Sequence, residues 1–131
     1  MKPSFERLPD AEYDVMDIIW QSEQPLKTSA ILSRLHEEQG KDWNISTLQS
    51  LLTRLQQRGY IDFKNEGRLK LYYPLIDRHS YTRQETQSFF SRFHRNSYKS
   101  LFAALTGGRK ISRESLDELS EIVRNAGKED D

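Results

Sequence analysis

The chain has 131 residues, of which 35% are hydrophobic and 31% are charged, and its formal net charge is zero. This length suits one domain or one small domain with an extension, and the modest apolar content is typical of a helix-rich protein whose core a partner chain completes. Cysteine is absent, which excludes disulfides and thiolate metal sites, and no apolar run or signal-peptide core points to a membrane, so we expect a cytoplasmic protein without direct membrane binding.

Two helices are predicted within the first 40 residues. Pro9 precedes the first helix, at about residues 10–22, which has acidic residues near its start, where the helix dipole favours them. Pro25 ends this helix, because the residue before a proline avoids helical geometry. Thr28 is expected to cap a second helix at about Ser29–Gln39.

The third predicted helix begins after its cap, Asn44, and ends before Gly59, a natural stop. Four leucines from Leu48 to Leu55 recur at i, i+3, i+4 and i+7 and form one apolar stripe. The side chains between them are short hydroxyls, amides and one arginine, which are the types that reach base edges and phosphates in a major groove. The residues predicted to contact DNA from the second and third helices are Thr28, Ser46, Thr47, Gln49, Ser50 and Arg54.

Two strand-like runs follow, at Tyr60–Lys64 and Leu69–Tyr73, in which apolar and polar residues alternate. Residues 65–68 supply the turn between them. The basic side chains that flank this turn are expected to touch backbone phosphates or the minor groove, and they are Lys64, Arg68 and Lys70. Helix, helix, helix and hairpin is the order of a winged helix-turn-helix, so we predict a mainly helical fold with a small antiparallel β-wing.

Three further helices are predicted after Pro74, with Asp77, Asn96 and Ser112 as their caps. Their apolar stripes are too large for three short helices to bury, so they pack onto the winged helix or form a symmetric dimer; we favour the dimer, which helix-turn-helix proteins use on two-fold operators. The predicted dimerisation residues are Tyr81, Phe89, Phe90, Phe93, Leu101, Phe102, Leu105, Leu116, Leu119, Ile122 and Val123. This gives a winged-helix DNA-binding domain at residues 1–74 and a helical dimerisation region at residues 75–131.

Positive charge is concentrated in the middle of the chain. Residues 41–74 carry six Lys/Arg against three Asp/Glu, and residues 75–110 carry seven against two. The flanking residues are acidic, with four against eight in residues 1–40 and three against seven in residues 111–131. The basic charge therefore lies in the predicted helix–wing stretch and in the segment after it.

Neither an enzyme nor a cofactor or metal site is predicted. The three histidines, His36, His79 and His94, lack the spacing of metal ligands, and no nucleophile–base pair or phosphate loop stands out. Polar residues between leucines are also typical of any solvated helix face, and winged helices also dock proteins, so a protein-interaction module is one alternative. Another is a repressor that senses a small ligand directly, in a pocket around Phe89 and Phe93.

Several sequence blocks resemble one family over nearly the whole chain. They are LPDAEYDVMDIIW in the first helix, STLQSLLTRLQQRGYI in the third, LYYPLI at the end of the wing and the closing ISRESLDELSEIV. In this order and spacing they are similar to the penicillinase and methicillin-resistance repressors. The resemblance implies a homodimeric transcriptional repressor with an N-terminal winged helix and a C-terminal helical dimerisation region.

The same resemblance implies a function and a mode of induction. Repressors of this family sit on a palindromic operator and keep antibiotic-resistance genes off. A membrane-bound sensor and zinc protease, triggered by a β-lactam, leads indirectly to cleavage in the short helix of the dimerisation region. In this chain Ala104 and Leu105 align with the cleavage point.

The chain departs from the family pattern at three places. Thr47 and Arg54 match the family's third helix, but Gln49 stands where Arg is expected and Ser50 where Thr is expected. Because Gln pairs with adenine and Arg with guanine, the operator is expected to differ. Ala104-Leu105 replaces the Asn-Phe pair of the family's cleavage point, and the paired cysteines of copper-sensing relatives are missing.

Overall fold

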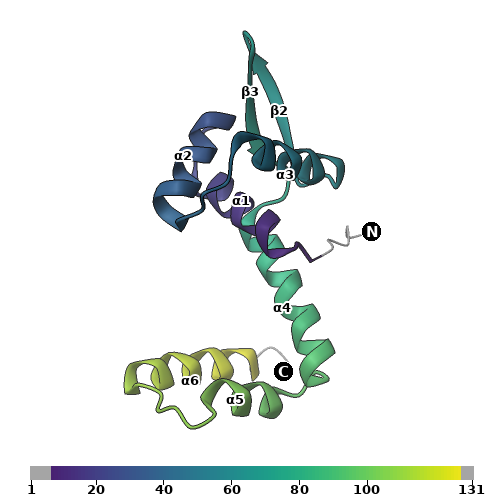
Figure 1. Cartoon of the computed structure of the whole chain (residues 1–131). Coiled ribbons are helices and arrows are strands. Elements are labelled where there is room, and N and C mark those ends of the chain that lie inside the picture. Colours follow the sequence, from purple (N-terminus) through teal and green to yellow (C-terminus); the bar gives the residue numbers. More distant parts are fainter. Residues whose placement is uncertain (1–6, 128–131) are drawn as a thin grey trace. The chain divides into compact units, whose positions relative to one another are not determined.

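The computed structural model of the chain describes residues 7–127 (Figure 1). Its elements are α1 (Asp10–Gln21), β1 (Leu26–Lys27), α2 (Thr28–Gln39), α3 (Ile45–Gln57), β2 (Ile61–Glu66), β3 (Leu69–Pro74), α4 (Arg78–His94), α5 (Tyr98–Thr106) and α6 (Arg113–Gly127). Contacts divide the chain into two compact units, residues 1–86 and residues 87–131, and the division falls within α4. We call them the winged unit and the helical unit.

The core of the winged unit is formed by the inner faces of α1, α2 and α3 and by the sheet. The four leucines of α3 from Leu48 to Leu55 are all buried, as their spacing predicts. The buried apolar side chains are Leu8, Val15, Met16, Ile18, Ile19, Ile31, Leu35, Leu48, Leu51, Leu52, Leu55, Tyr60, Ile61, Tyr72 and Tyr81. Since burying one such side chain stabilises a fold by about 1.5–3 kcal/mol, this cluster holds α3 firmly against the other elements.

The sheet has three antiparallel strands in the order β1-β3-β2. The hairpin of β2 and β3 turns at Gly67 and Arg68, with Glu66 opposite Leu69, and Figure 1 shows that it projects beyond the helices. Gly67 has a φ of +62°, a left-handed conformation that glycine adopts without steric cost. The predicted hairpin is confirmed, with a tighter turn than expected, and β1 is a strand that the sequence pattern did not predict.

The ends of α2 and α3 differ in how they are capped. The side chain of Asn44 accepts a hydrogen bond of 2.8 Å from the backbone N–H of Thr47, so the predicted cap of α3 is confirmed. After α3, Gly59 takes a φ of +82° and lets the chain reverse into β2. The predicted cap of α2 is wrong, because Thr28 is already the first helical residue and Lys27 precedes it without a side-chain cap.

The first turns of α4 belong to the winged unit. Asp77 caps the helix by accepting hydrogen bonds from the backbone and the hydroxyl of Ser80, as predicted. Trp20 Nε1 donates to the Ile76 carbonyl at 2.8 Å, and the Arg78 guanidinium lies over the Trp20 ring. Tyr81 is 4% exposed and accepts a hydrogen bond from the Leu8 backbone N–H. These contacts fasten the start of α4 to α1.

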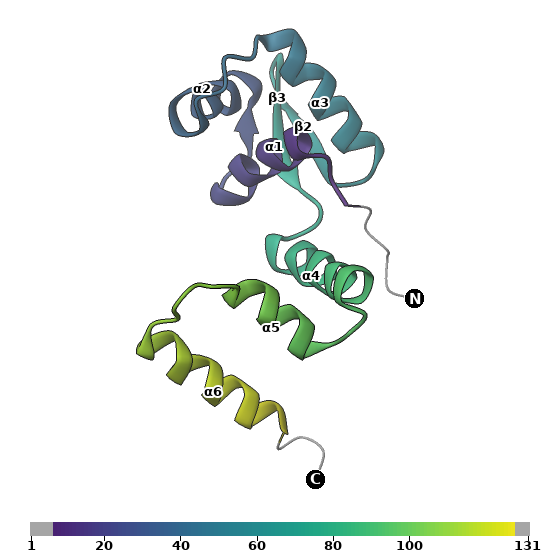
Figure 2. The same ribbon diagram turned by 60° about the horizontal axis from the view of Figure 1, so that its bottom comes forward.

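The helical unit, by contrast, leaves its apolar side chains exposed or only partly buried. Figure 2 shows α5 and α6 as successive helices joined by a loop, and neither has a buried residue in the part that the structure describes. Ser112 caps α6 as predicted, through a hydrogen bond from the Ser115 backbone N–H. Asn96 is not the cap of α5, because it takes a left-handed φ of +62° after α4, and Ser97 caps the helix instead.

Candidate nucleic-acid interface

An exposed polar row runs along α3 on the side opposite its buried leucines. Ser46, Ser50, Thr53 and Gln57 recur at i, i+4, i+7 and i+11, which places them in one line along a helix of 3.6 residues per turn. All four are exposed. A helix that is anchored by four leucines and presents hydroxyls and amides outward has the size and chemistry to enter a major groove.

The other predicted contacts of α3 flank this row on its two sides. Thr47, Gln49 and Arg54 are exposed. At 100° per residue, Gln49 lies on one flank, and Thr47 and Arg54 lie on the other. The structure thus brings all five residues predicted in α3 onto one exposed surface. Thr53 is one of the hydroxyl side chains between the leucines but was not among the predicted contacts, and Gln57 was missed, although its spacing from Ser46 and Ser50 could have revealed it.

Thr28 lies apart from that surface. It is half-buried at the start of α2, which adjoins β1 of the sheet. Burial raises the pKa of the Tyr72 phenol of β3, and the nearby Thr28 side chain opposes this shift. The residue that was predicted to contact DNA therefore lies against the sheet of the winged unit.

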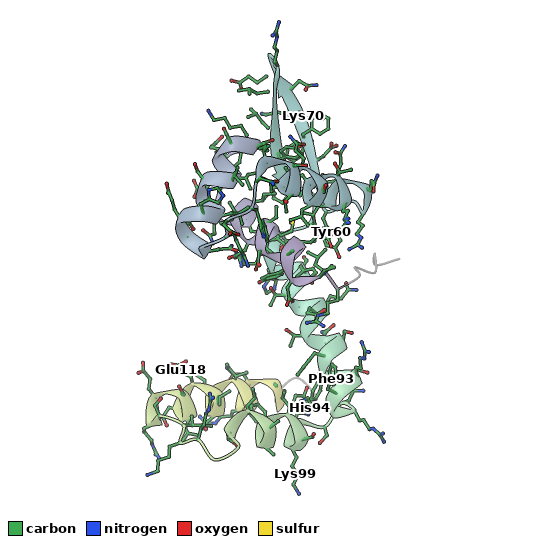
Figure 3. All side chains as sticks on the ribbon, viewed as in Figure 1. Tyr60, Lys70, Phe93, His94, Lys99 and Glu118 are labelled. Atoms are coloured by element: carbon green, nitrogen blue, oxygen red, sulfur yellow. The ribbon has the colours of Figure 1, made fainter. Side chains whose placement is uncertain are left out.

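The basic residues of the hairpin are exposed but do not share one face. Lys64 pairs with Leu71, whereas Lys70 pairs with Asn65, so the two lysines alternate to opposite faces of the hairpin. The Lys70 ammonium lies 4.6 Å from the centre of the Phe63 ring, and Figure 3 labels this lysine on the hairpin. Arg68 lies in the turn itself. A phosphate backbone that lies along one face of the hairpin would therefore contact Arg68 and only one of the two lysines closely.

An ion pair between a buried carboxylate and a partly exposed arginine supports the end of α3. Arg58, which follows the last residue of the helix, approaches Glu12 of α1 with Nη1 at 3.3 Å from Oε2. Glu12 is 1% exposed, and its Oε1 has no hydrogen-bond partner among the described residues. Sequence reasoning missed this pair, although Glu12 falls on the apolar stripe of α1, three residues before the buried Val15.

The residues predicted to dimerise fall in both units. Tyr81 is covered within the winged unit, in contact with the rings of Tyr13, Trp20 and Tyr60, so its own chain buries it and a partner chain cannot. The other ten lie on α4, α5 and α6 beyond Thr86, in the helical unit. The more exposed of them are Phe89 at 44%, Phe93 at 60%, Leu105 at 62%, Leu116 at 41%, Ile122 at 63% and Val123 at 60%. Figure 3 shows the side chain of Phe93 next to that of His94 at the end of α4.

Two further predicted features can be placed in the structure. Ala104 and Leu105 are exposed on α5. A cavity of about 270 Å³ lies in the winged unit, lined by residues of α1 and the start of α4 that include Tyr13, Tyr81 and Glu85. Its lining does not include Phe89 or Phe93, around which a ligand pocket was suggested.

Residues 7–127 offer neither a metal site nor a membrane-spanning helix. They contain no group of three or more His, Cys, Asp or Glu side chains that could hold a metal ion. No helix in this range combines the length and the hydropathy needed to cross a bilayer.

Three helices, an antiparallel hairpin and an exposed polar face on the third helix define the class of winged helix-turn-helix DNA-binding proteins. The sequence model of the penicillinase repressor family matches residues 8–125, and the chain belongs to that family. It is a family of transcriptional repressors and not of enzymes. The resemblance drawn from the sequence blocks is therefore confirmed.

Individual relatives agree with this assignment. The chain is 28% identical over 118 residues to the methicillin resistance regulatory protein MecI of Staphylococcus aureus (strain N315), covering 88% of this chain and 92% of that protein. It is 29% identical over 117 residues to the penicillinase repressor of Bacillus licheniformis, covering 89% of each. The solution structure of the DNA binding domain of the repressor BlaI is similar with a TM-score of 0.51 and 32% identity, over 62% of this chain and 94% of that chain. The predicted fold class is confirmed.

Proposed function

We propose that the protein is a homodimeric transcriptional repressor that binds a palindromic double-stranded operator through α3 and the hairpin of β2 and β3. The exposed polar row of α3, on a helix whose other face is fully buried, carries this proposal. The winged unit would contact DNA, and the helical unit, residues 87–131, would join two copies. The protein would act in the cytoplasm, where the operator is.

The exposed apolar residues of the helical unit support the homodimer. Ile122, Val123 and Leu105 are each at least 60% exposed, which is costly for an isolated chain. A two-fold dimer would cover such residues on both copies at once, and it would place two α3 helices on two half-sites. Joining two weak half-site contacts multiplies the affinity through effective concentration.

The genes controlled and the mode of induction belong to the proposal as well. We infer from family membership that the repressor controls β-lactam resistance or cell-wall stress genes and that a membrane sensor-protease system relieves it indirectly. Cleavage at Ala104-Leu105 would divide α5 and separate α6 from the rest of the chain. The dimer would then lose part of its surface and release DNA while α3 stayed intact.

Selection of bound fragments from random duplex DNA tests DNA recognition. Enrichment of a palindrome, with an affinity that falls steeply with salt, is the expected result. Gln49→Glu should abolish binding because it places negative charge on the exposed face of α3, whereas Gln24→Glu makes the same change at an exposed loop position and should bind normally. Failure to enrich any sequence, or equal binding by both variants, would contradict the proposal.

Sedimentation velocity tests the homodimer. Ile122→Glu should dissociate it, because the charge would be buried against the partner chain. Asn125→Glu adds the same charge to α6 at an exposed position outside the apolar stripe and should leave the dimer intact. A monomeric wild type at micromolar concentration would exclude dimer formation through this surface.

Insertion of a specific protease site at residues 104–105 tests relief by cleavage. Cutting there should dissociate the dimer and release the operator. The same site appended after residue 131 is the control and should leave both unchanged. Continued operator binding after complete cutting at residues 104–105 would contradict the proposed mode of relief.

A further inference from the structure

Thr53 lies at the centre of the exposed polar row of α3. It follows Ser46 by seven residues and Ser50 by three, and it precedes Gln57 by four, so the row passes through it. The helix turns behind it are held by Leu52 and Leu55, which are fully buried. If α3 enters a major groove, Thr53 therefore faces the base edges.

The hydroxyl of Thr53 is already used within the helix. Oγ1 donates a hydrogen bond of 2.9 Å to the carbonyl oxygen of Gln49, one turn earlier. Threonine commonly makes this bond to the i−4 carbonyl, and the bond fixes the χ1 rotamer. Because the hydroxyl hydrogen is already donated within the helix, the side chain presents to solvent a methyl group and an oxygen that can only accept a hydrogen bond.

The major groove contains one kind of apolar group, the 5-methyl group of thymine. The other groups on the base edges there are polar donors and acceptors. A methyl group on the exposed face of α3 is thus matched to thymine. A free hydroxyl, by contrast, could form hydrogen bonds with several different bases. Ser46 and Ser50, in the same row, have no methyl group and cannot make this contact.

We propose that Thr53 is a specificity-determining residue that contacts the 5-methyl group of one thymine in each operator half-site. The proposal rests on the proposed DNA-binding function and names a base that the helix selects. The contact is apolar, so it adds to discrimination without changing the number of phosphates neutralised.

Replacement of single thymines by deoxyuridine provides the test, because it removes only the methyl group. Each thymine of the selected operator is replaced in turn, symmetrically in both half-sites, and the affinity of the full-length protein is measured. Burial of one methyl group corresponds to about a three- to five-fold change in affinity per half-site. Wild type should show this loss at one thymine position that Thr53 contacts, and an absence of loss at every position would overturn the proposal.

Two variants assign the contact to Thr53. Thr53→Val keeps the methyl group and should bind thymine better than deoxyuridine at that position, as wild type does. Thr53→Ser keeps the hydroxyl and should bind the two duplexes equally. The salt dependence should be unchanged in both variants, and circular dichroism checks that α3 is retained.

The remaining outcomes are also decisive. If Thr53→Ser keeps the preference for thymine, another residue makes the contact. If Thr53→Val loses the preference for thymine and Thr53→Ser keeps it, the hydroxyl oxygen and not the methyl group makes the contact, and the proposal is wrong. A wild-type protein that selects no duplex in the first place would refute the proposed function itself, which is a different result from equal binding to thymine and deoxyuridine.

Discussion

The Nη1 atom of Arg58 lies 3.3 Å from Oε2 of Glu12 and joins the end of α3 to a carboxylate that is almost wholly buried in α1. Only one oxygen of that carboxylate is satisfied among the described residues. A buried charge that loses its partner is more costly than a pair that was never made. The stability of the end of α3 is therefore sensitive to substitution of either residue.

Replacing Arg58 by Met should destabilise the winged unit more than replacing both residues. Arg58→Met leaves a buried carboxylate unpaired, which costs about 1–3 kcal/mol for a pair that is partly open to solvent. Glu12→Met with Arg58→Met removes both charges and should recover much of this loss. Urea unfolding at neutral pH measures the difference, and a double variant less stable than Arg58→Met would contradict the explanation.

Gln49 and Arg54 should respond differently to truncation. Gln49→Ala should weaken operator binding by about 1–3 kcal/mol and relax the preference at one base pair. Arg54→Ala should weaken binding to all sequences alike, because a phosphate contact carries no sequence information. Competition between operator and random duplexes separates the two effects. Equal losses on both duplexes for Gln49→Ala would mean that this side chain does not read a base.

The hairpin should contribute mainly to the salt dependence of binding. Neutralising Lys64, Arg68 and Lys70 together should lower the slope of log affinity against log salt by roughly 2–3 units. Because the two lysines lie on opposite faces of the hairpin, Lys64→Gln and Lys70→Gln should lower it unequally when measured singly. An unchanged slope in the triple variant would show that the hairpin points away from DNA.

Acid should weaken the start of α4. Two hydrogen bonds from Ser80 hold the pKa of the Asp77 carboxyl below its usual value of 3.8. A carboxyl whose pKa is lower in the folded state contributes stability above its unfolded pKa, and this contribution is lost as the pH falls through the folded pKa. The difference in unfolding free energy between wild type and Asp77→Asn should therefore be constant near neutral pH and shrink below about pH 4. A difference that does not change in acid would indicate that ionisation of Asp77 is irrelevant.

The length of the winged unit can be tested by truncation. A chain that ends at Thr86 keeps Tyr81, and we expect it to be a folded monomer with much weaker operator binding than the full chain. A chain that ends at Leu75 removes Tyr81 and uncovers Trp20 and Tyr13, so it should be less stable by about 3–5 kcal/mol, as when a large buried aromatic residue is lost. Thermal unfolding compares the two. If the shorter chain is equally stable, Tyr81 is not part of the core in solution.

Features set by neighbouring residues could be predicted from the sequence. The caps Asn44, Asp77 and Ser112 each bond a backbone group three residues ahead, so the local pattern is sufficient. Asn96 and Ser97 show the limit of this reasoning. Both residue types cap helices, and the choice depends on the left-handed turn that ends α4.

Features set by distant residues could not be predicted. β1 has only two residues and exists because Leu26 and Lys27 pair with Tyr72 and Leu71, more than 40 positions away. Tyr81 is recognisable as apolar, but the sequence does not say whether its own chain or a partner covers it. The buried and exposed faces of α3 could be predicted because helical spacing alone separates the leucines from the polar residues.

Both tryptophans lie in the winged unit, Trp20 beneath Arg78 and Trp43 beside Lys41, and the sequence has no others. Tryptophan fluorescence therefore reports the unfolding of the winged unit alone, whereas far-ultraviolet circular dichroism reports the helices of both units. If the helical unit melts when its dimer dissociates, the dichroism transition will depend on protein concentration while the fluorescence transition will not. One unlabelled sample can thus separate the stability of the winged unit from that of the helical unit.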